Sequence, residues 1–162
     1  MPRKTRGTKR FVRVHNNSLW QADFKLCDND WWMISYQDGH SRFATGSVKV
    51  WNLTGGNAML LLGSVVKRYG ALRQILTGQG TWFKLARGET SGVGLRCGEF
   101  GVVHVCASVR RWLRVASLKF STKLIKQSRT ASKGTGVSYG YYNYTRLREG
   151  ICYLIPAEIY LN

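Results

Sequence analysis

The stretch Leu19–Trp51, LWQADFKLCDNDWWMISYQDGHSRFATGSVKVW, decides the architecture because it holds three extended segments in a row. Leu19–Leu26 alternates apolar and polar residues, and Trp31–Gln37 is rich in aromatic side chains, as strands are. An Asp-Asn-Asp turn separates these two segments, and the dipeptide Asp38-Gly39 separates the second from Arg42–Trp51. The stretch therefore predicts three antiparallel strands that follow one another as a meander.

A helix is predicted next, because the apolar period changes over Asn52–Tyr69. Thr54 is expected to cap the first turn, and Gly70 is expected to end the helix after a basic last turn. The apolar face of the helix consists of Ala58, Leu61, Leu62, Val65, Val66 and Tyr69.

Two further strands and a helical tail complete the pattern. Ile75–Thr77 is a short fourth strand that runs into Gly78-Gln79-Gly80, and the apolar run Val102–Ala107 predicts a fifth strand buried on both faces. The C-terminal third is expected to contain a basic helix over Val109–Lys126, a loop over Ser128–Gly140, an amphipathic piece over Tyr141–Arg148 and a last turn over Pro156–Leu161. The fold class is therefore α/β, with a mixed sheet of about five strands flanked by helices.

Length and composition place the chain among globular proteins without a membrane span. At 162 residues, 44% hydrophobic and 12% aromatic, it is long and apolar enough for one domain with its own core. No apolar run reaches the roughly 18 residues that cross a bilayer, and no apolar segment follows the basic N-terminus as in a secretory signal. We therefore expect no membrane partner and a cytoplasmic, nucleoid-associated protein.

The charge of the chain is the main functional clue in its composition. It has 25 lysines and arginines against 8 acidic residues, which gives a formal net charge of +17. A domain this basic is typical of nucleic-acid binders, although an inert basic surface stays an alternative. The residues expected to contact DNA lie in two blocks: Arg3, Lys4, Arg6, Lys9, Arg10 and Arg13, then Arg110, Arg111, Arg114, Lys119, Lys123 and Lys126.

Several smaller features have ordinary structural explanations. The four cysteines include no CxxC pair and are expected to be reduced, and Cys97, His104 and Cys106 match no standard zinc spacing. Asp38 is expected to form the turn, and Gly78-Gln79-Gly80 lacks the pattern of a phosphate-binding loop. The aromatic residues of the meander are expected to pack in the core rather than stack on bases: Trp20, Trp31, Trp32, Tyr36 and Phe43.

Four blocks in order carry a family resemblance. They are WQADFK within Leu19–Lys25, WMISYQDGHSRF at Trp32–Phe43, the end of Ala58–Phe83 (YGALRQILTGQGTWF) and the tail YYNYTRLREGICYLIPAEIYL. These blocks resemble the DDE transposases and retroviral-type integrases, whose catalytic core has the ribonuclease H-like fold. The resemblance implies DNA strand transfer with Mg²⁺ or Mn²⁺ held by three carboxylates, because two-metal phosphoryl transfer needs hard oxygen ligands on both ions.

The sequence differs from this family at the positions of the catalytic carboxylates. The resemblance matches Asp23 to the first catalytic aspartate, with an ordinary polar residue on a strand face as the alternative. The second place, in a block that the family reads as TD-x-G-x-x-F, holds Gly78, and the third place falls near Lys119. The histidine that the family has near the end of the tail is replaced by Arg148. Asp23 alone is expected to hold a metal only weakly, so we expect no tightly bound metal.

The resemblance also implies a domain organisation. Residues 1–14 are expected to be a basic arm or linker remnant, and residues 15–162 an integrase-like core whose pattern is degraded over 84–98 and 112–140. We expect a shortened and degenerate transposase of a prokaryotic mobile element, without strand transfer of its own and without upstream DNA-binding domains. Its expected partners are DNA and either a second copy or a related transposase. A non-catalytic DNA- or RNA-binding protein that regulates such a transposase, and an active nuclease with a rearranged metal site, stay alternatives.

Overall fold

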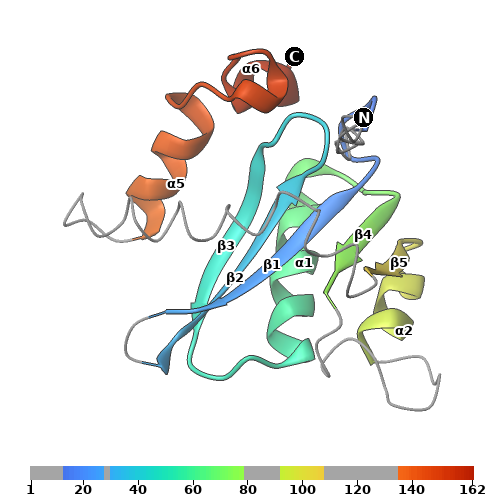
Figure 1. Ribbon diagram of the computed structural model, residues 1–162. Coiled ribbons are helices and arrows are strands. Elements are labelled where there is room, and N and C mark those ends of the chain that lie inside the picture. Colours follow the sequence, from blue (N-terminus) through green and yellow to red (C-terminus); the bar gives the residue numbers. More distant parts are fainter. Residues whose placement is uncertain (1–12, 28–29, 79–91, 108–134) are drawn as a thin grey trace, which may run out of the picture.

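The computed structural model describes residues 13–27, 30–78, 92–107 and 135–162. A five-stranded sheet in the order β3-β2-β1-β4-β5 lies at its centre (Figure 1). The strands are β1 (Trp20–Leu26), β2 (Trp32–Asp38), β3 (Ala44–Val50), β4 (Gln74–Thr77) and β5 (Val103–Cys106). The helices are α1 (Gly55–Tyr69), α2 (Gly92–Glu99), α5 (Thr135–Tyr144), the 3-10 turn η3 (Glu149–Ile151) and α6 (Pro156–Tyr160).

The strand pairing confirms an α/β fold with a mixed sheet. Strand β2 is antiparallel to both β1 and β3, so the first three strands form the predicted meander. Strand β4 then runs parallel to β1, and β5 runs parallel to β4. Helix α1 provides the crossover from β3 to β4 that parallel pairing with β1 requires.

The two faces of the sheet differ because successive side chains of a strand point to opposite sides. The α1 face is apolar, and Trp20, Ala22, Ile34 and Tyr36 on it are almost fully buried in the main core. The approach of α1 to β3 is close, since a Cβ at Gly46 would lie 2.3 Å from Cγ1 of Val65. A residue without a side chain is therefore required at this point of β3.

The predicted ends of α1 are those observed. The Thr54 hydroxyl accepts a hydrogen bond from the Asn57 backbone N–H at 3.1 Å, which satisfies one of the free donors of the first turn. Gly70 has a φ of 88° and donates its backbone N–H to the carbonyl of Val66. The last predicted turn is confirmed as α6, with Pro156 at its first position.

The tail packs on the β2–β3 hairpin, on the face of the sheet opposite α1. In Figure 1, α5 and α6 lie beside the β3 edge, far from α2. The ring of Tyr160 stacks on Phe43 with 4.5 Å between centroids, and the Tyr160 hydroxyl donates to Oδ1 of Asn17 at 2.7 Å. Burial raises the pKa of the Tyr160 hydroxyl, with the Asp38 carboxylate as a second cause.

Three sequence-based predictions differ from the structure. Strand β5 is not buried on both faces: Val103 is 57% exposed and Cys106, on the opposite face, is exposed as well, because β5 is the edge strand of the described sheet. The predicted loop Ser128–Gly140 overlaps α5, which begins at Thr135. The third strand begins at Ala44 rather than at Arg42, whose φ of 64° is incompatible with extended backbone.

The predicted basic helix lies outside the described residues, and the prediction for the aromatic cluster is confirmed in part. The predicted basic helix Val109–Lys126 begins and ends outside the described residues. Of the aromatic cluster, Trp20, Tyr36 and Phe43 are buried as expected, whereas Trp31 is 38% exposed. The Trp31 ring contacts Trp51 edge to face, with 4.7 Å between centroids. Within the described ranges, every helix is too short or too polar to span a bilayer.

Candidate functional site

Asp23 lies in the middle of β1, the central strand of the sheet, and is only 5% exposed. It points to the face opposite α1, since its neighbours Ala22 and Trp20 belong to the α1 core. Its cross-strand partner on β2 is Ser35. The side chain makes interactions of its own within the fold. The sequence resemblance therefore selected an acidic residue that the fold places at the centre of its polar face.

Gly78 follows the end of β4, the strand next to β1. Trp20 pairs with Ile75 and Gln21 with Leu76, and the same register continued for two residues would bring Gly78 level with Asp23. Neighbouring strands are about 4.8 Å apart, so a side chain at position 78 would reach the Asp23 carboxylate. The position that the resemblance assigns to the second aspartate therefore follows the strand next to Asp23 and has no side chain. The third place, near Lys119, is outside the described residues.

The described residues do not fit a two-metal centre. No three side chains of His, Cys, Asp or Glu within the described ranges come close enough together to hold a metal ion. Magnesium prefers six oxygen ligands in octahedral geometry, and Gly78 provides no carboxylate. No chemical step through Mg²⁺ or Mn²⁺ follows from this donor set.

A second acid of the meander, Asp38, has a structural role. It is fully buried at the end of β2, where its Oδ1 accepts from the backbone N–H of Asn17. Its Oδ2 accepts from the backbone N–H groups of His40 and Ser41 and from the Ser41 hydroxyl. These four hydrogen bonds confirm Asp38 as the residue that forms the β2–β3 turn.

The polar face around Asp23 contains further buried polar side chains. The Ser35 and Ser47 hydroxyls are 2.9 Å apart across β2 and β3. Gln21, two residues before Asp23 on the same face, is 2% exposed, and neither atom of its amide has a hydrogen-bond partner. Gln37 on β2 is the cross-strand partner of Gln21 on β1. Its Nε2 donates to the Arg42 carbonyl at 2.8 Å and to the Tyr142 hydroxyl.

Most of the residues expected to contact DNA are outside the described ranges. Of the twelve, only Arg13 is described, and its Nη2 donates to Oε1 of Gln74 at 2.9 Å. Arg13 therefore packs against the start of β4 instead of extending from a free arm. The eleven others are Arg3, Lys4, Arg6, Lys9, Arg10, Arg110, Arg111, Arg114, Lys119, Lys123 and Lys126.

Of the three residues considered as zinc ligands, His104 and Cys106 lie close together. On β5, the His104 Nε2 and the Cys106 Sγ are 3.7 Å apart, and Nε2 is also 2.8 Å from the Thr77 hydroxyl. Burial lowers the pKa of the His104 ring. Cys97 instead lies in the main core from α2, where burial raises the pKa of its thiol to about 11. The three side chains therefore form no common set of ligands.

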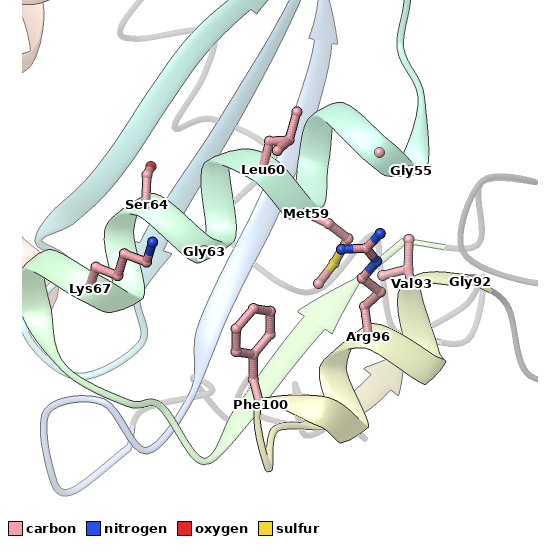
Figure 2. Close-up of a pocket in the computed structure, with 11 residues that line it drawn as sticks. Gly55, Met59, Leu60, Gly63, Ser64, Lys67, Gly92, Val93, Arg96 and Phe100 are labelled. Atoms are coloured by element: carbon pink, nitrogen blue, oxygen red, sulfur yellow. The ribbon is translucent and has the colours of Figure 1, made fainter.

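A separate groove lies between α1 and α2, on the other side of the sheet. It has a volume of about 860 Å³, and Figure 2 shows Lys67 and Leu60 of α1 together with Arg96 and Phe100 at the opposite wall. Because Asp23 points to the opposite face of the sheet, this groove is not part of the Asp23 site.

The tail contains arginines near Tyr142 that the sequence pattern did not indicate. The guanidinium of Arg148 lies over the ring of Tyr142, with Cζ 3.7 Å from the ring centroid. Arg42 and Arg146 are close enough to Tyr142 to lower the pKa of its hydroxyl, which burial raises by a larger amount. A signal was present, because Arg146 and Arg148 follow Tyr142-Asn143 in the tail block. Arg42 is distant in sequence, so the spacing of residues could not reveal that it lies near Tyr142.

Comparisons with known proteins identify the fold. No family model matches the chain, and no curated protein sequence matches it. A chain of the simian T-cell lymphotropic virus intasome, solved with PP2A regulatory subunit B56 gamma, superposes with a TM-score of 0.75 at 13% identity over 94% of this chain. This chain spans 57% of that viral chain.

The integrase catalytic core domain of HTLV-2, solved with magnesium, matches along almost its whole length. Its dimeric form superposes with a TM-score of 0.65 at 14% identity, over 91% of this chain and 98% of that domain. Its trimeric form gives 0.67 at 12% identity over the same shares. At these identities the likeness defines the fold alone, and the chain has the ribonuclease H-like fold of retroviral integrase catalytic cores.

Proposed function

We propose that this chain is an integrase- or transposase-like DNA-binding protein of a prokaryotic mobile element, without strand-transfer activity of its own. The observation that supports the proposal is an integrase-core fold in which Asp23 is buried on the central strand and Gly78 follows the end of the neighbouring strand β4. One acid is kept at the centre of the polar face, and its neighbour at the family's second acidic place lacks a carboxylate. The net charge of +17 supports binding of a polyanion.

DNA binding is the first half of the proposal, and its test is a titration at several salt concentrations. If six to ten cationic side chains neutralise phosphates, affinity for double-stranded DNA falls on the order of 10³–10⁵-fold between 50 and 200 mM salt. The triple variant Arg110→Gln, Arg111→Gln, Arg114→Gln is expected to bind more weakly with a shallower salt slope. Its matched control removes three exposed arginines of the described fold: Arg68→Gln, Arg73→Gln and Arg96→Gln.

The outcomes separate a DNA-binding surface from general basicity. Equal losses in both triple variants would assign binding to net charge rather than to the block at 110–114. No binding by the unaltered chain at 50 mM salt would remove the proposed function.

The second half of the proposal is that this chain does not catalyse DNA strand transfer. Each lost metal ligand contributes to several kcal/mol of transition-state stabilisation, so two missing acids imply a rate lower by more than about 10³-fold. The assay is nicking and strand transfer on supercoiled plasmid with Mg²⁺ or Mn²⁺. Metal-dependent cleavage that disappears in Asp23→Ala would contradict the proposal and restore the nuclease alternative.

The cellular context belongs to the same proposal. A cytoplasmic, nucleoid-associated protein that pairs with a second copy or with a related transposase is consistent with DNA binding without catalysis. Terminal inverted repeats in the DNA beside the coding sequence would support the mobile element. Suppression of transposition by a related active transposase, when this chain is co-expressed, would support a regulatory role.

A further inference from the structure

We propose that Cys106 is a redox modification site, at which His104 accepts the thiol proton while a hydroperoxide oxidises the sulfur. A small-molecule thiol then caps the oxidised sulfur. The site lies at the ends of β4 and β5, and it does not depend on the proposed DNA binding.

The register of β4 and β5 brings the two side chains together. His104 pairs with Ile75 and Cys106 with Thr77, so His104 and Cys106, two positions apart, lie on one face of β5. Nε2 of His104 is 3.7 Å from Sγ of Cys106, a hydrogen-bonding distance for sulfur. A thiol and an imidazole in contact form a pair of nucleophile and base.

A third side chain fixes the imidazole. Thr77 is fully buried at the end of β4, and its Oγ1 is 2.8 Å from Nε2 of His104 and 3.8 Å from Sγ of Cys106. The same hydroxyl lies 3.2 Å from the carbonyl of Gly78, so it is held on two sides. A buried hydroxyl therefore positions the base beside the nucleophile, as activation of a thiol requires.

The surroundings of His104 keep its ring able to take up a proton. The ring is half-buried, and burial lowers its pKa, so the neutral form is favoured near pH 7. In the tautomer with the ring proton on Nδ1, Nε2 carries the lone pair that accepts the proton of the Cys106 thiol.

Dissolved oxidants can reach the sulfur of Cys106. It is exposed on the edge strand of the described sheet. Cys97 is fully buried in the main core, and Cys27 is partly buried against a separate apolar cluster. Cys152 is exposed as well but forms no hydrogen bond to a histidine within the described ranges, so it provides an internal reference.

The reaction balances with the two co-reactants named. The Cys106 sulfur attacks one oxygen of the hydroperoxide, the O–O bond breaks, and the thiol proton passes through Nε2 of His104 to the leaving oxygen. The products are a sulfenic acid and water or an alcohol, with sulfur oxidised and the peroxide reduced. The small thiol then displaces the hydroxyl of the sulfenic acid and gives a mixed disulfide and water.

The test compares Cys106 with Cys152 in the full, reduced chain exposed to hydrogen peroxide at pH 7. Dimedone traps sulfenic acids, and mass spectrometry of peptides gives the rate at each cysteine. We expect Cys106 to be trapped about tenfold faster than Cys152, because a positioned base accelerates loss of the thiol proton. Equal rates at the two cysteines would overturn the proposal.

Variants of the base and of its anchor assign the effect. His104→Gln is expected to lower the Cys106 rate about tenfold and to leave the Cys152 rate within twofold. Thr77→Val keeps the shape of the side chain and is expected to cause a smaller loss at Cys106. The matched control is His40→Gln, because Nδ1 of His40 contacts the Arg13 carbonyl rather than a thiol. An unchanged Cys106 rate in His104→Gln would contradict the role of the imidazole.

Added imidazole separates a chemical role of His104 from a structural one. In His104→Ala, free imidazole should restore part of the Cys106 rate and change the Cys152 rate by less than twofold. Circular dichroism before the reaction establishes that the variant is folded. No recovery in the folded variant would count against proton transfer to His104, and the comparison within the unaltered chain stands even if a variant fails to fold.

The capping step has its own readout. With glutathione as the small thiol, the peroxide-treated chain should carry one glutathione on Cys106, which dithiothreitol releases, and none on Cys97. A Cys106 that reacts with dimedone but never with glutathione would overturn the capping step.

Discussion

Asn143 on α5 forms two hydrogen bonds with the backbone of Ala44 on β3, accepting from its N–H at 2.8 Å and donating to its carbonyl at 2.9 Å. The amide of Asn143 thereby occupies the place of a further strand at the β3 edge. Both residues are fully buried, so water cannot replace these bonds. This contact attaches the tail, which includes Tyr142 and Arg148, to the sheet.

We predict that Asn143→Ala lowers the free energy of unfolding by about 1–3 kcal/mol, because it removes two buried hydrogen bonds to the backbone of Ala44. Urea denaturation followed by circular dichroism measures the change. The control is Asn57→Ala, which removes an exposed amide that donates to the Asn52 carbonyl. Similar losses in the two variants would show that the Asn143 contact does not stabilise the fold.

We predict that Gly46→Ala costs about 1–3 kcal/mol of stability, because its Cβ would overlap Val65 and force α1 away from β3. Val65→Ala in the same chain is expected to restore part of the loss by making room. Gly92→Ala serves as the control, since no atom lies within 4 Å of the added Cβ. Additive losses in the double variant would contradict this packing contact.

We predict that stability falls as pH rises from about 9 to about 11. Burial raises the pKa of Cys97 from 9.0 to about 11, so the unfolded chain loses this proton first and is favoured over that range. Burial also raises the pKa of the Tyr142 hydroxyl, which acts in the same direction. Urea midpoints at pH 8 and pH 10.5 measure the fall, which should be smaller in Cys97→Ala and unchanged in Cys152→Ser.

The same pKa predicts the order of thiol alkylation. Thiolates are the reactive form, so the exposed Cys106 and Cys152 should react with iodoacetamide at pH 8, while Cys97 reacts only after unfolding. Mass spectrometry of peptides from native and urea-treated protein identifies the modified residues. Fast modification of Cys97 in the native protein would show that α2 opens readily.

We predict that Gly78→Asp raises Mn²⁺ affinity slightly without producing DNA cleavage. If the register of β1 and β4 continues from Gln21–Leu76 to position 78, the new carboxylate adjoins Asp23 and gives two oxygen ligands, but the third acid is still missing. Calorimetry with Mn²⁺ and the plasmid assay measure the two effects, with Gly78→Asn as the uncharged control. Equal Mn²⁺ binding by both variants would contradict the adjacency of positions 23 and 78.

The sequence alone was sufficient to predict the local elements of secondary structure. Alternation predicts β1 and β2, the helical period predicts α1, and the roles of Thr54, Gly70 and Asp38 follow from their own chemistry. These features depend on residues a few positions apart, so a linear pattern contains them. The fifth strand shows the limit, because an apolar run does not reveal that β5 is an edge strand.

Only the tertiary structure decided which distant residues meet. The parallel pairing of β1 with β4 places Gly78 at the end of the strand next to Asp23, and the docking of the tail brings Tyr142 close to Arg42, to which Gln37 links it. Family resemblance named Asp23 and Gly78 but not their register, and no pattern joined Arg42 to the tail. Contacts of this kind depend on strand order and on the docking of α5 on β3, which result from burial of the whole core and not from any one segment.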